Sequence, residues 1–398
     1  MKRLFRIGSS NFLASFLPVL SWLLLGIILD PNLVNVYSIT YPLWFIYSLM
    51  VCIFGSGANV AERKDKQEDG VLSEITVGTV LSIFFCVVLV LIVEPYLTFM
   101  NVDVETYRVF ATYSIVYLFI NIIFALIREK MYFEHKDKQA SIHTIIIAVL
   151  NLVLLNGIAL ITKNQVVIIS VTLGVIGLYV LVLLLMQYKK FKLTFNFLPN
   201  IKYESENIVL YVLLFVTYFF GFSNTFVFGE EYLAAINLAV LVTDAQWDSC
   251  EAMKTIAKID IVEKKYDFKK TTKQSYVFVS TLVLTSIIAF FALFNIYGVD
   301  LKLGLIYLSF DLFTMFFCAP VYYFEPMSQI EFSPIKNTIF YLICETIRAA
   351  CSMFIPFAFC TQIGQIACNL LLLTILLVVK KRNFVMDENG YLVRKQIN

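Results

Sequence analysis

Long apolar stretches separated by short polar segments fill the chain from residue 11 to residue 379. A helix of about twenty apolar residues crosses the hydrocarbon core of a bilayer, and the sequence contains twelve such stretches. The pattern therefore predicts an all-α, polytopic membrane protein with twelve transmembrane helices. Their approximate limits are 11–29, 36–58, 75–95, 108–127, 141–162, 166–187, 207–229, 232–253, 275–295, 303–324, 337–356 and 358–379.

Lysine and arginine gather on one side of the predicted membrane. If the N-terminus is cytoplasmic, the segments on that side carry 27 Lys and Arg residues, against Arg108, Lys163 and Lys302 on the other side. Cytoplasmic loops are enriched in these two residues. We therefore expect both termini in the cytoplasm, an even number of spans, and a place in the plasma membrane.

Twelve spans divide into two blocks of six, which would place both halves the same way up in the membrane. The triplet YFE follows the fourth span at Tyr132 and the tenth span at Tyr323, 191 residues later, and this coincidence with span order favours a duplication. The expected organisation is a lobe at 1–187, a cytoplasmic connector at 188–206, a second lobe at 207–379 and a cytoplasmic tail at 380–398.

Composition narrows the class of protein further. With 60% hydrophobic and 15% charged residues, a soluble protein could not bury its apolar surface. The net charge of +2 gives no sign of a nucleic-acid partner. The eight cysteines form no CxxC pair, only two histidines are present, and the phosphate-binding GxxxxGK[ST] pattern is absent. We expect a monomer that is not an enzyme and holds neither a metal nor a cofactor.

Ionisable residues inside a span are costly in hydrocarbon, at least about 2.5 kcal/mol each, and usually serve function. Asp311, in the apolar stretch IYLSFDLFTMFF, is the clearest single candidate for a functional ionisable residue. The alternative is that it only bonds to Ser309, Thr314 or a neighbouring helix. We favour a functional carboxylate, since burial suits it to binding Na⁺ or H⁺.

A second group of acids lies in LVTDAQWDSCEAM. On a helix, Asp244, Asp248 and Glu251 fall within roughly 60° of one another and form an acidic stripe, with Trp247 beside it. We expect Asp244 to be deep and to line an aqueous cavity. Asp248 and Glu251 would approach a solvated helix end, where Lys254 and Lys258 can pair with them.

Four further polar residues have two interpretations each. Asp30 is either a functional acid or part of a solvent-facing DPN turn, and Asn151 either supplies a neutral oxygen ligand or links helices. Glu345 and Arg348 are three residues apart, which favours a structural ion pair over binding of an anion by Arg348.

Several stretches, read in order, resemble the multidrug and toxic compound extrusion (MATE) family of the multidrug/oligosaccharidyl-lipid/polysaccharide (MOP) flippase superfamily. They are LGIILDPNLVNVYSI, FGSGANVAERKDKQEDG, VEPYLTFMNVDVETYRVFATYSIVYLFI and YLAAINLAVLVTDAQWDSCEAMKTIAKIDIVEKKYDFKK. The resemblance implies a V-shaped, two-lobed exporter driven by Na⁺ or H⁺. It also implies that Asp311 takes part in cation coupling and that Asp30 matches a position used in the N-terminal lobe.

The expected function is export of small amphipathic or cationic compounds from the cytoplasm in exchange for Na⁺ or H⁺, by alternating access. The alternative is a flippase for lipid-linked oligosaccharide or polysaccharide precursors. A flippase handles anionic headgroups and usually presents several basic residues to its cavity, whereas the predicted spans contain one arginine and at least four acids. This balance favours the exporter.

Overall fold

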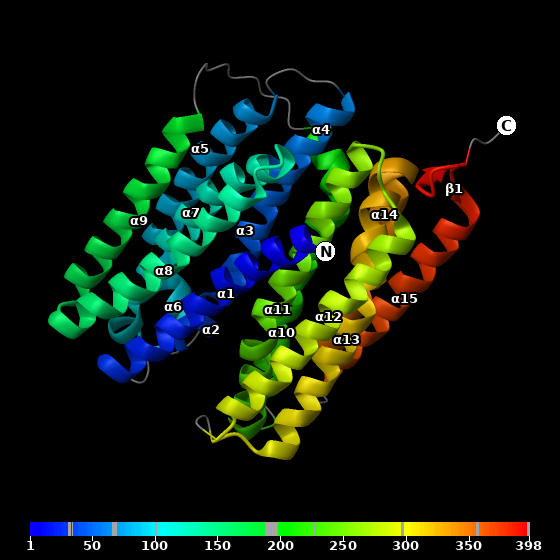
Figure 1. Ribbon diagram of the computed structural model, residues 1–398. Coiled ribbons are helices and arrows are strands. Elements are labelled where there is room, and N and C mark those ends of the chain that lie inside the picture. The colour runs from blue at the N-terminus through cyan, green and yellow to red at the C-terminus, as the bar shows by residue number, and fades with distance from the viewer. Residues whose placement is uncertain are drawn as a thin grey trace. The chain divides into compact units, whose positions relative to one another are not determined.

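The computed structural model describes residues 1–395 except 31, 32, 34, 66–69, 100–101, 188–197, 227, 229, 296–297 and 356–357. The described chain is helical apart from one small hairpin (Figure 1). The first helices are α1 (Lys2–Ile28), α2 (Asn35–Thr40), η2 (Tyr41–Leu43), α3 (Trp44–Val51), η3 (Cys52–Gly57), α4 (Ala58–Asp65), α5 (Gly70–Leu91), α6 (Val93–Phe99), α7 (Val104–Phe133), α8 (Asp137–Ile161) and α9 (Gln165–Gln187). The later elements are α10 (Leu198–Phe226), α11 (Glu230–Val262), α12 (Phe268–Leu293), α13 (Leu301–Met327), η4 (Ser328–Phe332), α14 (Pro334–Phe354), α15 (Cys360–Asn383), β1 (Phe384–Met386) and β2 (Leu392–Arg394).

The chain forms two compact units. The N-terminal unit comprises Leu13–Ile201, and the C-terminal unit comprises Met1–Phe12 together with Lys202–Asn398. The expected first lobe began at residue 1, whereas the structure groups the first turns of α1 with the second half of the chain. The division is otherwise close to the middle of the sequence.

Specific contacts explain why the start of α1 belongs to the C-terminal unit. The carbonyl of Gly8 accepts a hydrogen bond from Ser249 Oγ at 3.1 Å, and Asn11 Nδ2 donates to the carbonyl of Asp248 at 3.2 Å. A Cβ atom at position 8 would lie 2.3 Å from Cζ of the buried Phe278 ring. Only glycine permits so close an approach of α1 to α12.

In the C-terminal unit, α13 packs against α11, α12 and α15, and α14 packs against α15. Small residues on α11, such as Ala235 and Ala239, belong to the same apolar core as Phe290 and Tyr307. The expected tail at 380–398 begins with the last turn of α15 and continues into the β1–β2 hairpin. The hairpin is tied to this unit by the amide of Leu392, which donates to the Tyr266 carbonyl at 2.9 Å.

In the N-terminal unit, α7 is the most enclosed long helix and packs against α5 and α9. The two YFE triplets lie in the last turns of α7 and α13. Arg63 donates to the carbonyl of Phe133, and the Tyr266 hydroxyl donates to the carbonyl of Tyr323. Each triplet thus provides a backbone carbonyl that accepts a hydrogen bond from a side chain elsewhere in its own unit.

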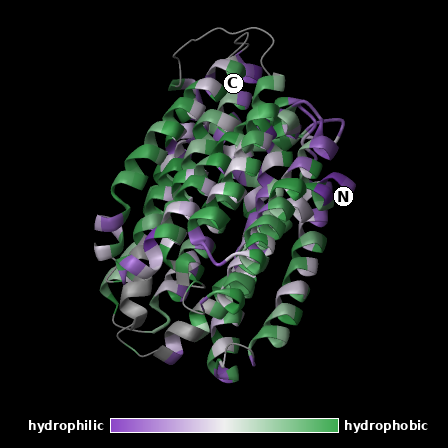
Figure 2. Ribbon diagram, turned by 90° about the vertical axis from the view of Figure 1, so that its left-hand side faces the viewer, coloured by the Kyte–Doolittle hydropathy of each residue, from purple (hydrophilic) through white to green (hydrophobic). Residues whose placement is uncertain are grey.

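Apolar residues cover most of each long helix, with hydrophilic residues concentrated near helix ends (Figure 2). Within the described residues, nine helices are long and apolar enough to cross a bilayer. This confirms the all-α, polytopic architecture. The helices α10, α11 and α14 are not among the nine, so the count of twelve spans stays a prediction.

Candidate functional site

Asp311 lies in the interior of α13, and its side chain is 7% exposed. The hydroxyl of Thr243, on α11, donates to Asp311 Oδ2 at 3.2 Å. Ser309 and Thr314 bond instead to backbone carbonyls of their own helix, at 2.6 and 2.9 Å. Of the partners expected for Asp311, it is therefore the neighbouring helix α11 that donates a hydrogen bond to it.

Charged groups from two more positions lie within electrostatic reach of Asp311, namely Asp244 on α11 and Arg348 on α14. The guanidinium of Arg348 forms an ion pair with Glu345 at 3.6 Å and stands over the Tyr218 ring at 5.8 Å. We call this set the Asp311 cluster, made of Thr243, Asp244, Asp311, Glu345 and Arg348.

The Asp311 cluster has more carboxyl groups than cations. It contains three acids and one guanidinium, and Glu345 already engages that guanidinium while accepting a bond from Cys368 Sγ at 3.2 Å. The repulsion among an excess of carboxylates in a poorly solvated interior falls when they bind a proton or a small cation that prefers oxygen ligands. The cluster is therefore chemically suited to bind H⁺ or Na⁺.

An open groove of about 890 Å³ runs along the same helix as Asp311. Its walls include Ile306, Phe310, Phe313 and Ile366, while Lys302 lies at the start of the helix. Asp311 does not line the groove but is directed toward α11, where Thr243 binds it. One helix thus presents an apolar, aromatic surface and holds a buried acid.

The acidic stripe on α11 differs in part from its expected gradient. Asp244 and Glu251 are half-buried, Asp248 is exposed, and Trp247 is half-buried with its ring 6.4 Å from that of Tyr322. Asp244 lies near Asp311, as the electrostatic contact shows. The stripe therefore reaches the Asp311 cluster at one end only.

The structure corrects the expectation of a solvated end for this stripe. The helix continues to Val262, and Lys254 and Lys258 are only 3% and 5% exposed. Lys254 pairs with Glu325 at 2.9 Å, and Lys258 pairs with Glu204 at 2.5 Å. The lysines are buried because α10 and α13 supply carboxylates to neutralise them, which the pattern of α11 alone could not reveal.

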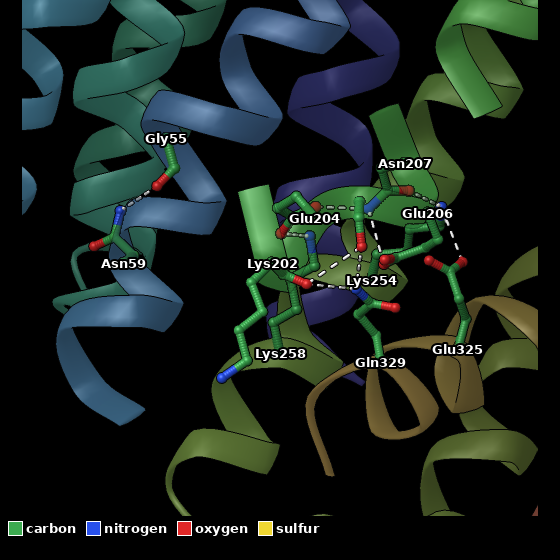
Figure 3. Close-up of polar contacts among 11 residues, drawn as sticks. Gly55, Asn59, Lys202, Glu204, Glu206, Asn207, Lys254, Lys258, Glu325 and Gln329 are labelled. Carbon is green, nitrogen blue, oxygen red and sulfur yellow. Dashed lines mark hydrogen bonds and ion pairs between the residues drawn. The ribbon is translucent and has the colours of Figure 1, made fainter. Parts of the chain in front are cut away.

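These lysines belong to a second polar group, which we call the Glu206 cluster (Figure 3). Its members are Glu204, Glu206, Asn207, Glu251, Lys254, Lys258 and Glu325. Sequence reasoning missed the acids at 204 and 206 because they fell in the expected connector. The one available signal was Pro199, since proline is favoured in the first turn of a helix and α10 begins at Leu198.

The remaining candidates lie in the N-terminal unit. Asp30 follows the last turn of α1, half-buried, and its carbonyl accepts from the amide of Leu33 at 3.0 Å, as in a turn. Asn151 is 2% exposed and accepts a hydrogen bond from the Tyr113 hydroxyl, which links α8 to α7. The structure thus gives Asn151 a helix-linking bond, while a ligand role for either residue stays a prediction.

The fold and its polar groups define the class of the protein as a polytopic α-helical membrane protein made of two units. No family model matches the chain, and no curated protein matches it. Solved structures do. It is similar to an outward-facing multidrug resistance MATE family transporter of the MOP superfamily (TM-score 0.69, 14% identity, 95% of this chain and 94% of that chain).

Two further structures are similar. One is a MOP superfamily transporter from Pyrococcus furiosus Vc1, described as having a binding pocket of reverse polarity that suggests a different function (TM-score 0.72, 13% identity, 95% and 94% coverage). The other is the Vibrio cholerae MATE transporter VcmN with a D35N mutation (TM-score 0.67, 11% identity, 95% and 95% coverage). The chain therefore has the fold of MATE transporters.

Proposed function

We propose that the protein is a secondary active exporter that moves small amphipathic or cationic compounds out of the cytoplasm in exchange for Na⁺ or H⁺ by alternating access. The observation that carries this proposal is the buried Asp311, bonded to Thr243 and close to Asp244, inside a MATE-like fold. The proposed location is the plasma membrane, with both termini cytoplasmic. The protein carries out transport without chemical conversion of its substrate.

Asp311 is the proposed coupling residue because its charge state depends on the ion that it holds. Without a bound cation, the carboxylates of Asp311 and Asp244 repel each other in a poorly solvated interior. Binding of H⁺ or Na⁺ removes that repulsion. A cation gradient can then drive the protein between states that differ in affinity for the ion.

The groove along α13 is the proposed contact surface for substrate. Its aromatic residues, Phe310 and Phe313, suit the apolar part of an amphipathic molecule, and they lie on the helix that holds Asp311. Because Asp311 is directed toward α11 and does not line the groove, a substrate held there would be coupled to the cation through α13 itself. An exchange mechanism requires that the substrate and the coupling cation favour different states of the protein.

The alternative proposal is a flippase for lipid-linked oligosaccharide or polysaccharide precursors. The reason to keep it is that the similar Pyrococcus furiosus transporter is described as having a binding pocket of reverse polarity that suggests a different function, so this fold is not confined to one kind of pocket. The buried cations Lys254, Lys258 and Arg348 each have a carboxylate partner in this chain. Such pairing leaves them poorly suited to bind a pyrophosphate headgroup, which favours the exporter.

The test is transport of a fluorescent organic cation in proteoliposomes under imposed Na⁺ or H⁺ gradients. We expect one of the two gradients to drive transport in the unmodified protein, and Asp311→Asn to abolish that dependence while the protein still folds. Asp244→Asn should weaken it less, because Asp244 is half-buried and partly hydrated.

Asp267→Asn is the matched control. Asp267 caps the start of α12 through a bond from the Lys270 amide at 3.0 Å, and asparagine caps a helix equally well. The exporter proposal fails if no gradient moves the cation. Flipping of a lipid-linked sugar in the same vesicles, insensitive to Asp311→Asn, would establish the alternative instead.

A further inference from the structure

Four carboxyl groups and two ammonium groups meet in the Glu206 cluster. Glu204 and Glu206 come from α10, Glu251 from α11, and Glu325 from α13, against Lys254 and Lys258 from α11. Two of the acids are neutralised directly, Glu204 by Lys258 at 2.5 Å and Glu325 by Lys254 at 2.9 Å. Glu206 and Glu251 are left as the excess.

These two remaining acids have different surroundings. Glu251 is half-buried and can be hydrated. Glu206 is 0% exposed, its Oε1 accepts a long bond from Asn207 at 3.4 Å, its own backbone amide also interacts with the carboxyl group, and its Oε2 has no hydrogen-bond partner among the described residues. An ionised carboxylate in that position would be a fully buried charge without an ion pair of its own among the described residues, which is a destabilising arrangement in a protein.

The neighbours of Glu206 make ionisation still less favourable. Glu325 and Glu204 both act on it with negative charge, whereas Lys258 acts with positive charge. Asn207 cannot compensate, since its Nδ2 makes its shorter bond to Glu204 at 2.6 Å and its Oδ1 accepts from Lys254 at 3.0 Å. On α14, Tyr341 also lies within reach of Glu206 but is a neutral phenol.

We propose that Glu206 is a proton-binding site of the C-terminal unit, separate from the Asp311 cluster, and that its side chain is a neutral carboxylic acid at neutral pH. A proton fits the site better than a metal ion, because the described residues contain no group of three acidic, histidine or cysteine side chains that could hold one. The bound proton leaves the fully buried carboxylates, Glu204 and Glu325, matched by the two lysines, while Glu251 is half-buried and lies outside this balance. Its loss would make Glu206 compete with Glu204 and Glu325 for the two lysines.

The Glu206 cluster is also connected to the Asp311 cluster by charge. Lys254 lies within electrostatic reach of Glu345, which pairs with Arg348, which in turn acts on Asp311. A proton gained or lost at Glu206 therefore alters the field around Asp311 through groups that are already paired. The proton site itself does not depend on the proposed transport function, because it is a property of the folded protein at rest.

Infrared difference spectroscopy of the purified full-length protein tests the proposal. We expect a C=O stretching band of a protonated carboxyl group at neutral pH that disappears in Glu206→Gln and persists in Glu388→Gln, an exposed control between β1 and β2. If the band is unchanged in Glu206→Gln, Glu206 is ionised and the proposal is wrong.

The pH dependence of the melting temperature gives a second measurement. A carboxyl that keeps its proton in the folded state stabilises the fold at low pH, and this stability is lost as pH rises through the folded-state pKa. The melting temperature should therefore fall with pH less steeply in Glu206→Gln than in the unmodified protein. Because glutamine has the shape of the neutral acid, the variant should melt no lower at neutral pH.

Two results would overturn the proposal in this measurement. A melting temperature of Glu206→Gln well below that of the unmodified protein at neutral pH would mean that a carboxylate is needed there. Stabilisation of the unmodified protein by NaCl over choline chloride, absent in Glu206→Gln, would mean that the site holds Na⁺ rather than a proton.

Discussion

The two units bury polar side chains in different ways. In the C-terminal unit, the interior holds charged groups, with Glu204, Lys258, Asp311, Glu345 and Arg348 all less than 9% exposed. They neutralise one another in pairs or remain as excess acids. A unit of this kind depends on pH and on ions, since its stability rests on titratable groups.

The N-terminal unit buries mainly neutral polar groups in the part between α1, α7 and α8. Asn156 Nδ2 donates to Ser21 Oγ at 2.8 Å, Tyr113 donates to Asn151, and the Trp22 ring packs edge-on against Tyr113 at 5.7 Å. These bonds keep their strength across the physiological pH range. The comparison teaches that a network of neutral hydrogen bonds around α1, α7 and α8 can hold helices together without ions, whereas the C-terminal unit places clusters of excess acids in its interior; the N-terminal unit also buries charged residues elsewhere, such as Arg128 and Glu129.

The largest effect should follow from breaking a buried ion pair in the C-terminal unit. Lys258→Met leaves Glu204 charged and fully buried, and we expect a loss of about 3–5 kcal/mol of stability. Thermal unfolding in detergent measures it. Lys265→Met is the control, because that lysine is exposed and its pair with Glu263 contributes at most about 1 kcal/mol. Equal melting temperatures for the two variants would mean that the buried ion pair does not stabilise the C-terminal unit more than an exposed pair does.

A smaller effect is expected in the neutral network of the N-terminal unit. Tyr113→Phe deletes the hydroxyl that Asn151 accepts from and should cost about 1–3 kcal/mol, because a buried amide oxygen loses its partner. The loss should be the same between pH 6 and about pH 8, since neither group titrates there. Thr98→Val, at an exposed position on α6, serves as the control. A strongly pH-dependent loss would show that a titratable group acts on this network of neutral bonds.

Two glycines should give effects of opposite sign, and the stabilising one should be the smallest of all. A Cβ atom at Gly364 would lie 2.8 Å from Cys351 Cβ and 3.1 Å from the Arg348 carbonyl, so Gly364→Ala should force α14 and α15 apart and cost about 1–3 kcal/mol. At Gly174 in α9 nothing lies within 4 Å, and Gly174→Ala should gain up to about 1 kcal/mol from helix propensity. Opposite shifts in melting temperature are the expected outcome, and shifts of the same sign would contradict it.

The length of the apolar stretches was sufficient to predict the helical membrane fold, because a span must be apolar along about twenty residues whatever its neighbours are. Asp311 could also be found, since a lone acid in such a stretch is conspicuous. Its partner Thr243 could not, because hydrogen bonding between helices depends on how α11 and α13 pack. The same limit explains the buried lysines at 254 and 258, whose carboxylates come from distant positions in the sequence.

The grouping of Met1–Phe12 with the second half has a consequence for how the protein is synthesised. Gly8 leaves the ribosome early, yet Ser249, which donates to its carbonyl, follows 241 residues later. The N-terminal unit can close once Ile201 has emerged, because domains tend to fold as they are made. The first turns of α1 therefore have no α11 to pack against until most of the chain has been synthesised. A nascent chain stalled before residue 249 would therefore contain a folded N-terminal unit, while Met1–Phe12 would still lack the helix against which it packs.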